Sequence, residues 1–328
     1  MNRSDNPFVN IRANDVTELP ANDRFAAAGH LWSQPEIDAL ILAHAARRPL
    51  LVRGEPGSGK SQIARAAAVK MGDAPLLVEV IHPRFEALDL LYRLDAVERL
   101  ADAQIPGQLD RSNEKYVKRG RLWEAFKLMG KSNAMPVLLI DEIDKADADV
   151  PNALLDVLGN RSFDVPPLGQ TVKAEGGGLP LIIITTNEER ELPAAFVRRC
   201  AVLNVNPPKE DKEEPLFVEW LVERGRVHGH LEISEEARRQ AAQQVLADRK
   251  AAIEEGYPKV GLAEYIDLLT ALYELTQGSP KKQRAVEQIE WLTRLSAYAL
   301  IKNAEQDQSR GRKRLASSAE NPEEKPSP

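Results

Sequence analysis

The chain has 328 residues, enough for two domains of ordinary size with an apolar core in each. Its net charge of −6 and isoelectric point near 5.6 do not indicate a globally basic nucleic-acid-binding protein. The single cysteine, Cys200, excludes an internal disulfide and fits a reducing compartment. With no signal-peptide pattern and no apolar run long enough for a membrane span, we expect a cytoplasmic protein without a membrane segment.

The first predicted elements lead into a glycine-rich loop. Residues 1–30 are polar and have no clear period, so we expect a mobile N-terminal arm. Ser33-Gln34-Pro35-Glu36 predicts a helix start, because proline suits the first turn and glutamate lies at capping-box spacing. Apolar strands are predicted over 50–53 and 76–81, and leucines at helical spacing predict a helix over 84–103.

A complete P-loop, G-x-x-x-x-G-K-S, follows the first of these strands. Its glycines let successive N–H groups face a phosphate chain, Lys60 adds a charge at the β- and γ-phosphates, and Ser61 offers a hydroxyl to Mg²⁺. The helix predicted over 62–71 points its positive end at the same place. We therefore predict a nucleoside-triphosphate site made of Gly54, Glu55, Pro56, Gly57, Ser58, Gly59, Lys60, Ser61 and Gln62.

A second signature follows the buried strand predicted over 137–140. That strand ends in Asp141, which is suited to the Mg²⁺ shell together with Ser61, and in Glu142, which is suited to act as a general base on water. A buried strand that leaves the sheet through an acidic turn is the alternative interpretation. The intact P-loop upstream favours the catalytic one.

Two further polar signals lie beyond a Pro- and Gly-rich segment over 161–180, which indicates a hairpin or flexible loop. The strand predicted over 181–186 ends at Asn187, which is suited to orient water beside the γ-phosphate, although asparagine is also common in turns. Arg198 and Arg199 come next and are suited to stabilise charge on a neighbouring subunit's γ-phosphate. Two solvated arginines at a helix end are the alternative.

The pattern changes near Pro207. Strands alternating with helices before this point predict a parallel α/β sheet. From about 214 to 304 the spacing predicts helices only, at 215–225, 234–255, 262–277 and 281–303. Residues 305–328 are rich in Ser, Pro, Glu and Lys, and we expect a disordered tail there.

The order of these parts resembles AAA+ ATPases, and in particular the MoxR-type, dynein-related branch that carries a helix-2 insert. The resemblance covers about residues 33–300. Four stretches carry it: Arg48 to Ser61, Asp89 to Ala96, Leu139 to Ala146 and Glu189 to Cys200.

The resemblance implies an AAA+ P-loop NTPase core at 31–208 with an insert at about 92–121, and an all-α lid at 209–304. It implies that ATP and Mg²⁺ bind between core and lid. Asn187 resembles sensor 1, Arg199 the arginine finger with Arg198 as second choice, and Lys259 the sensor 2 position, where many relatives have arginine. It further implies a homo-oligomeric ring, of six subunits, and a von Willebrand A-domain protein as partner.

Three functions remain open. The resemblance favours the remodelling of a protein client or complex. A nucleic-acid motor of a restriction or defence system is the alternative, since the insert carries Lys115, Lys118, Arg119 and Arg121 beside Tyr116 and Trp123. A solvated face balanced by Asp110 and Glu114 is the favoured interpretation of those cations. A slow nucleotide switch that scaffolds a complex is the third possibility.

Overall fold

The structure is a computed structural model and describes residues 6–129, 135–175, 178–209 and 213–300. Contacts divide the chain into two compact units, with the division between Asn206 and Pro207. The boundary predicted at 208 lies close to this division. Residues 305–328, for which we expect a disordered tail, lie outside the described residues.

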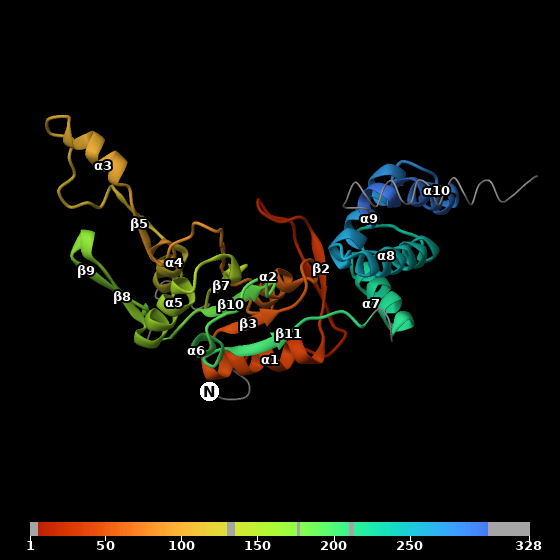
Figure 1. The fold of residues 1–328 in the computed structure, drawn as a ribbon, viewed down its shortest axis with the longest axis horizontal. Helices are drawn as coiled ribbons and strands as arrows, with labels where there is room; N and C mark the ends of the chain where they lie inside the picture. The colour runs from red at the N-terminus through yellow and green to blue at the C-terminus, as the bar shows by residue number, and fades with distance from the viewer. Residues whose placement is uncertain (1–5, 130–134, 176–177, 210–212, 301–328) are drawn as a thin grey trace, which may run out of the picture. The chain divides into compact units, whose positions relative to one another are not determined.

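The first unit is built around a five-stranded sheet whose order is β11-β3-β10-β7-β4 (Figure 1). Every neighbouring pair is parallel, which confirms the predicted parallel α/β fold. β11 is the one sheet strand that the sequence pattern did not predict. The strands are β3 (Leu50–Arg53), β4 (Leu76–Val80), β7 (Val137–Asp141), β10 (Leu181–Thr186) and β11 (Ala201–Asn204).

Helices cover both faces of this sheet, because alternate strand residues point to opposite sides. Leu138 and Ile140 of β7 join one apolar cluster with α4 and α5, while Val137 and Leu139 join the other with α1 and α2. The capping box predicted at Ser33 and Glu36 is present at the start of α1. The helices are α1 (Gln34–Ala46), α2 (Lys60–Lys70), α4 (Arg121–Leu128), α5 (Asp149–Asn160) and the short α6 (Ala194–Val197).

The N-terminal segment differs from the expected mobile arm. From residue 6 onward it packs on the core, with β1 (Val16–Leu19) antiparallel to β2 (Ala28–Leu31). Phe8 and Trp32 are fully buried, and the Arg65 guanidinium of α2 donates to two carbonyl oxygens between these strands. The few apolar residues have no regular spacing, so no periodic pattern indicated this hairpin. Residues 1–5 lie outside the described part.

The helix predicted over 84–103 is wrong. The structure divides this stretch into a 3₁₀ turn η2 (Ala87–Leu90), a strand β5 (Tyr92–Leu94) and α3 (Ala96–Ala103). β5 pairs antiparallel with β6 (Val117–Arg119), so the insert is a hairpin that carries a helix. A Cβ at Gly120 would lie 2.3 Å from the Leu90 carbonyl oxygen, so the chain passes η2 closely here. The leucines at helical spacing therefore lie in different elements: Leu88 in η2, Leu94 in β5 and Leu100 in α3.

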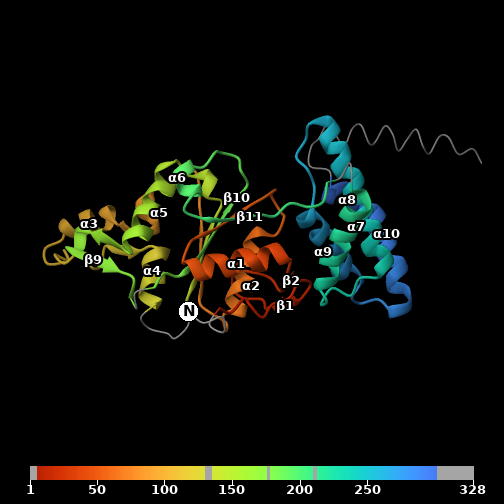
Figure 2. The same cartoon turned by 90° about the horizontal axis from the view of Figure 1, so that it is seen from below.

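A second hairpin lies beside this insert. β8 (Ser162–Val165) and β9 (Gln170–Lys173) are joined by η4 (Pro166–Leu168), which confirms the hairpin interpretation of this segment. Asn113 of the insert donates from Nδ2 to the Pro167 carbonyl oxygen at 2.8 Å. Both views show the two projections at the same end of the first unit (Figures 1 and 2). Gly176 and Gly177 lie outside the described residues.

The second unit has only helices as regular elements in its described part: α7 (Glu214–Val227), α8 (Glu235–Glu255), α9 (Leu262–Thr276) and α10 (Lys281–Leu300). They pack around their own apolar cluster, whose members include Phe217, Val245 and Leu269. The helices begin and end close to the predicted positions, and the predicted end of the last helix, at 303, lies outside the described residues. Within the described ranges of both units, no helix combines the length and the apolarity that crossing a bilayer requires.

Candidate nucleotide-binding site

The P-loop leaves the carboxyl end of β3 and curls back to the start of α2. Gly54 lies against the chain that follows β11, where a Cβ would be 2.1 Å from the Val205 carbonyl oxygen. Gly57 and Gly59 have φ of +72° and +90°, in the left-handed region that favours glycine. The loop conformation therefore depends on these three glycines, through close approach at the first and through backbone angle at the others.

Lys60 is a buried cation at the first position of α2. Its Nζ donates to the carbonyl oxygens of Gly54 at 2.8 Å and Glu55 at 2.7 Å, so the ammonium lies across the loop. Burial lowers the pKa of Lys60, and the surrounding carboxylates of Asp141, Asp144, Glu142 and Glu55 act in the opposite direction. An ammonium held at the positive end of a helix is suited to bind phosphate.

Ser61 and Asp141 bring the oxygen ligands for Mg²⁺ together. The Ser61 hydroxyl lies 2.8 Å from Asp141 Oδ1 and 3.0 Å from Oδ2, although the two residues are 80 positions apart. Hydroxyl and carboxylate oxygens are the ligands that Mg²⁺ prefers, and this ion usually keeps several waters and phosphate oxygens besides. Among the described residues no group of three or more His, Cys, Asp or Glu side chains forms a metal site. The pair fits an ion that binds together with a nucleotide.

Thr185 links the two acidic residues and was not predicted. It is 1% exposed, and its hydroxyl donates to Asp141 Oδ1 at 2.5 Å while it accepts the Glu142 backbone N–H at 3.0 Å. One side chain thus fixes both the carboxylate of Asp141 and the backbone at Glu142. The available signal was a polar residue at the end of an otherwise apolar strand, next to Asn187.

Glu142 and Asn187 lie together, as the sequence predicts. Glu142 has φ of +61°, which turns the chain sharply out of β7 into η3 (Ile143–Lys145). Its Oε1 accepts from Asn187 Nδ2 at 3.4 Å, and its Oε2 accepts from Lys145 Nζ at 2.6 Å. The buried Asp144 accepts the backbone N–H groups of Asn187 at 3.4 Å and Glu189 at 2.9 Å. Hydrogen bonds therefore join the acidic turn to the loop that follows β10.

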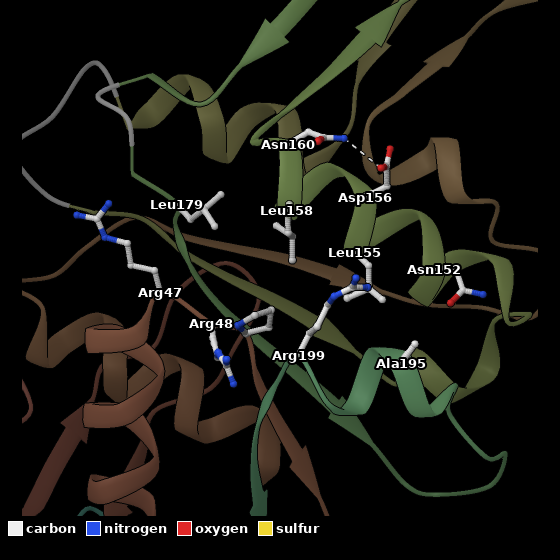
Figure 3. Close-up of a pocket in the computed structure, with 12 residues that line it drawn as sticks. Arg47, Arg48, Asn152, Leu155, Asp156, Leu158, Asn160, Leu179, Ala195 and Arg199 are labelled. Carbon is white, nitrogen blue, oxygen red and sulfur yellow. Dashed lines mark hydrogen bonds between the residues drawn. The ribbon is translucent and has the colours of Figure 1, made fainter.

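The two arginines lie on different cavities. Arg198 lines a cavity of about 500 Å³ with Arg53, Thr186 and Glu188, at the carboxyl edge of the sheet where the P-loop begins. Arg199 lines a cavity of about 570 Å³ with Arg48, Pro49 and residues of α5, at the amino edge. Figure 3 shows Arg199 pointing toward α5, while Arg47 and Arg48 point away from it. Among the described residues, neither the Arg198 nor the Arg199 side chain forms a hydrogen bond or an ion pair; their backbone N–H groups donate to the carbonyl oxygens of Ala194 and Phe196.

The remaining predicted residues take other positions. Ser58 is buried and lines the loop, Pro56 is exposed, and Gln62 accepts a hydrogen bond of 3.4 Å from Arg65. Lys259 is exposed and belongs to the second unit, in the segment between α8 and α9. Its assignment as sensor 2 stays a prediction.

Residues 49–200 match the family of AAA domains of the dynein-related subfamily. The match begins one residue before β3 and ends at Cys200, so it contains the P-loop, the Asp141-Glu142 pair, Asn187 and both arginines. Within the α/β unit, residues 49–200 are therefore similar to an AAA domain. The MoxR-type branch is a finer assignment that this family match does not make.

Solved structures with some likeness include the protein NtrX from Brucella abortus in complex with ATP, at 16% identity and a TM-score of 0.46, covering 87% of this chain and 61% of NtrX. NtrX in complex with ADP matches at 18% identity and a TM-score of 0.45, covering 76% and 52%. A RuvB variant from Thermotoga maritima matches at 15% identity and a TM-score of 0.42, covering 79% and 70%. A further NtrX match covers 71% of this chain and 47% of NtrX, so the chain spans about half the length of NtrX in that match.

Proposed function

We propose that the chain hydrolyses ATP in an assembled ring and uses the energy to remodel a protein client. The observation that carries the proposal is the meeting of five side chains at one edge of the sheet: Lys60, Ser61, Asp141, Glu142 and Asn187. Residues suited to bind the phosphates, bind the metal ion, orient the water and accept its proton are all present there.

The reaction we propose is in-line attack of water on the γ-phosphorus. Glu142 accepts the proton of the water as the new P–O bond forms and the bond to the bridging oxygen breaks, giving ADP and phosphate. Lys60 neutralises charge on the phosphates, and Asn187 orients the water. Ser61 and Asp141 would hold Mg²⁺, which would supply further positive charge when bound.

The position of Arg199 supports hydrolysis that depends on assembly. Ala201 pairs with Leu50 at the start of two parallel strands, so Arg199 lies at the amino edge of the sheet. The P-loop begins at the opposite edge, about 13 Å away for a four-residue strand. An arginine on the far side of the sheet is placed to serve a neighbour's nucleotide, and we propose a closed ring of six subunits. The cavity of Arg198 lies on its own subunit's P-loop side, which makes it the weaker candidate.

The contacts of the insert favour a protein client over nucleic acid. In the basic cluster of Lys115, Lys118, Arg119 and Arg121, three side chains form ion pairs: Lys115 with Asp102 and Glu98, Lys118 with Glu98, and Arg121 with Glu124. The fourth, Arg119, stacks over the Trp123 ring at 5.5 Å. Cations already paired within the insert are poorly disposed to neutralise phosphates.

The insert also exposes apolar side chains. Leu94, Val97, Leu100 and Ile105 are 41%, 80%, 65% and 47% exposed, whereas Asp102, between them in sequence, is buried. α3 therefore turns its charged side toward its own hairpin and leaves an apolar side uncovered, which suits contact with apolar segments of a polypeptide. We would also test whether a protein with a von Willebrand A domain binds this chain as its partner.

The deciding experiment measures steady-state ATPase rate alone, with linear duplex DNA and with a permanently unfolded protein, at one low salt concentration. Lys60→Ala, which should not bind ATP tightly, is the control. Stimulation by the unfolded protein alone is the expected result. Stimulation by DNA alone would replace the proposal with the nucleic-acid motor. A slow rate that responds to neither would favour the scaffolding switch.

A further inference from the structure

Lys145 contacts the residue to which we assign the general-base role. Its Nζ donates to Glu142 Oε2 at 2.6 Å, and the two side chains are 34% and 31% exposed. This is a short, charge-assisted hydrogen bond. It lies beside the Asp141-Glu142 pair, at a residue outside the P-loop.

The backbone fixes this pairing. Lys145 N–H donates to the Glu142 carbonyl oxygen at 3.0 Å, which closes η3 directly after the left-handed residue. Thr185 holds the Glu142 N–H, and Asp144 holds the backbone of the sensor loop. The backbone on both sides of the pair is therefore held in place.

Both oxygens of the Glu142 carboxylate are engaged. Asn187 donates to one at 3.4 Å, a long contact, while Lys145 donates to the other at 2.6 Å. A general base must accept a proton from the attacking water, so one oxygen has to be free to face it. The Lys145 contact is the shorter of the two and the only one between opposite charges, so it is the stronger restraint.

We propose that Lys145 is a positioning residue that restrains Glu142 and slows hydrolysis until the ion pair opens. This inference rests on the proposed ATPase function. The ammonium does not touch the reacting atoms in this role; it acts through the carboxylate. Loss of the positive charge should release Glu142 and raise kcat, while the P-loop, which Lys145 does not contact, should bind ATP as before.

The test is Lys145→Met, which keeps length and removes charge, compared with Lys145→Arg, which keeps charge. A partly exposed pair resists opening weakly, so we expect kcat to rise by up to about fivefold in Lys145→Met with KM unchanged. Lys145→Arg should stay near the parent rate. Lys127→Met is the matched control, since it removes an ion pair of similar exposure with Glu175 outside the site.

A double variant distinguishes an effect of Lys145 on Glu142 from general damage to the structure. If Lys145 acts through Glu142, adding Lys145→Met to Glu142→Gln should change the residual rate no further. A fall in kcat, an unchanged kcat or a changed KM in Lys145→Met would overturn the inference while leaving the ATPase proposal intact. A chain that binds ATP tightly but does not hydrolyse it, with or without Lys145, would instead contradict the proposed function and remove the basis of the inference.

Discussion

At the residue scale, the P-loop depends on one very close backbone approach. A Cβ on Gly54 would lie 2.1 Å from the Val205 carbonyl oxygen and 3.0 Å from its carbon, and neither atom can move without shifting the chain that follows β11. We expect Gly54→Ala to lower the free energy of unfolding by about 2–3 kcal/mol, in the upper part of the range for forced overpacking, and to weaken ATP binding.

Gly72→Ala is the matched control for this prediction. Gly72 also has positive φ, of +78°, but a Cβ there meets nothing within 4 Å. The strain of backbone angle alone should cost about 1 kcal/mol. Urea unfolding and titration with a fluorescent ATP analogue measure both variants. Equal loss of stability in the two would mean that the contact with Val205 is not what requires glycine.

The motif residues could be predicted individually from the sequence, but the hydrogen bonds that join them could not. The P-loop and Asp141-Glu142 are contiguous in sequence, so spacing alone indicates their chemistry. Thr185 bridges Asp141 and Glu142 because Ile184 pairs with Ile140 between β10 and β7. This register is set by packing of the whole sheet, and no local pattern around Thr185 contains it.

At the element scale, the insert shows how one helical period can mislead. Leu88, Leu91, Leu94 and Leu100 recur at helical spacing, yet they belong to a turn, a strand and a helix. Asp95 interrupts the run, since its side chain accepts the Glu98 N–H at 2.8 Å and caps a new helix. The segment over 161–180 was easier to interpret, because proline and glycine mark a hairpin directly.

The uncovered side of α3 gives a prediction about clients. Val97→Ser combined with Leu100→Ser removes two of its exposed apolar side chains without touching the buried Asp102. We expect stimulation by an unfolded protein to fall severalfold, with the basal ATPase rate unchanged. Val286→Ser, which alters another exposed apolar residue, 61% exposed in α10, should leave both rates as they are. Full stimulation in the double variant would exclude this face as the contact.

At the scale of the whole molecule, the separation of the two arginines has a consequence for assembly. Arg199 and the P-loop lie at opposite edges of one sheet, so a subunit cannot easily present its own Arg199 to its own nucleotide. Arg198 shares a cavity with Arg53, near the start of its own P-loop. The position of Arg199 fits the proposed ring, in which each subunit completes its neighbour's site, whereas the position of Arg198 does not.

Mixing two inactive variants tests this arrangement. Arg199→Ala should still bind ATP but hydrolyse it on the order of a thousandfold more slowly, and Glu142→Gln should bind ATP without turnover. In a mixed assembly, an intact Arg199 on a Glu142→Gln subunit meets an intact Glu142 on its neighbour. We therefore expect ATPase activity to return on mixing and to depend on the ratio of the two variants. Arg198→Ala mixed with Glu142→Gln is the matched comparison. If the Arg199 mixture stays inactive while the Arg198 mixture recovers, the finger is Arg198, and the position at the amino edge of the sheet does not identify the residue that acts in trans.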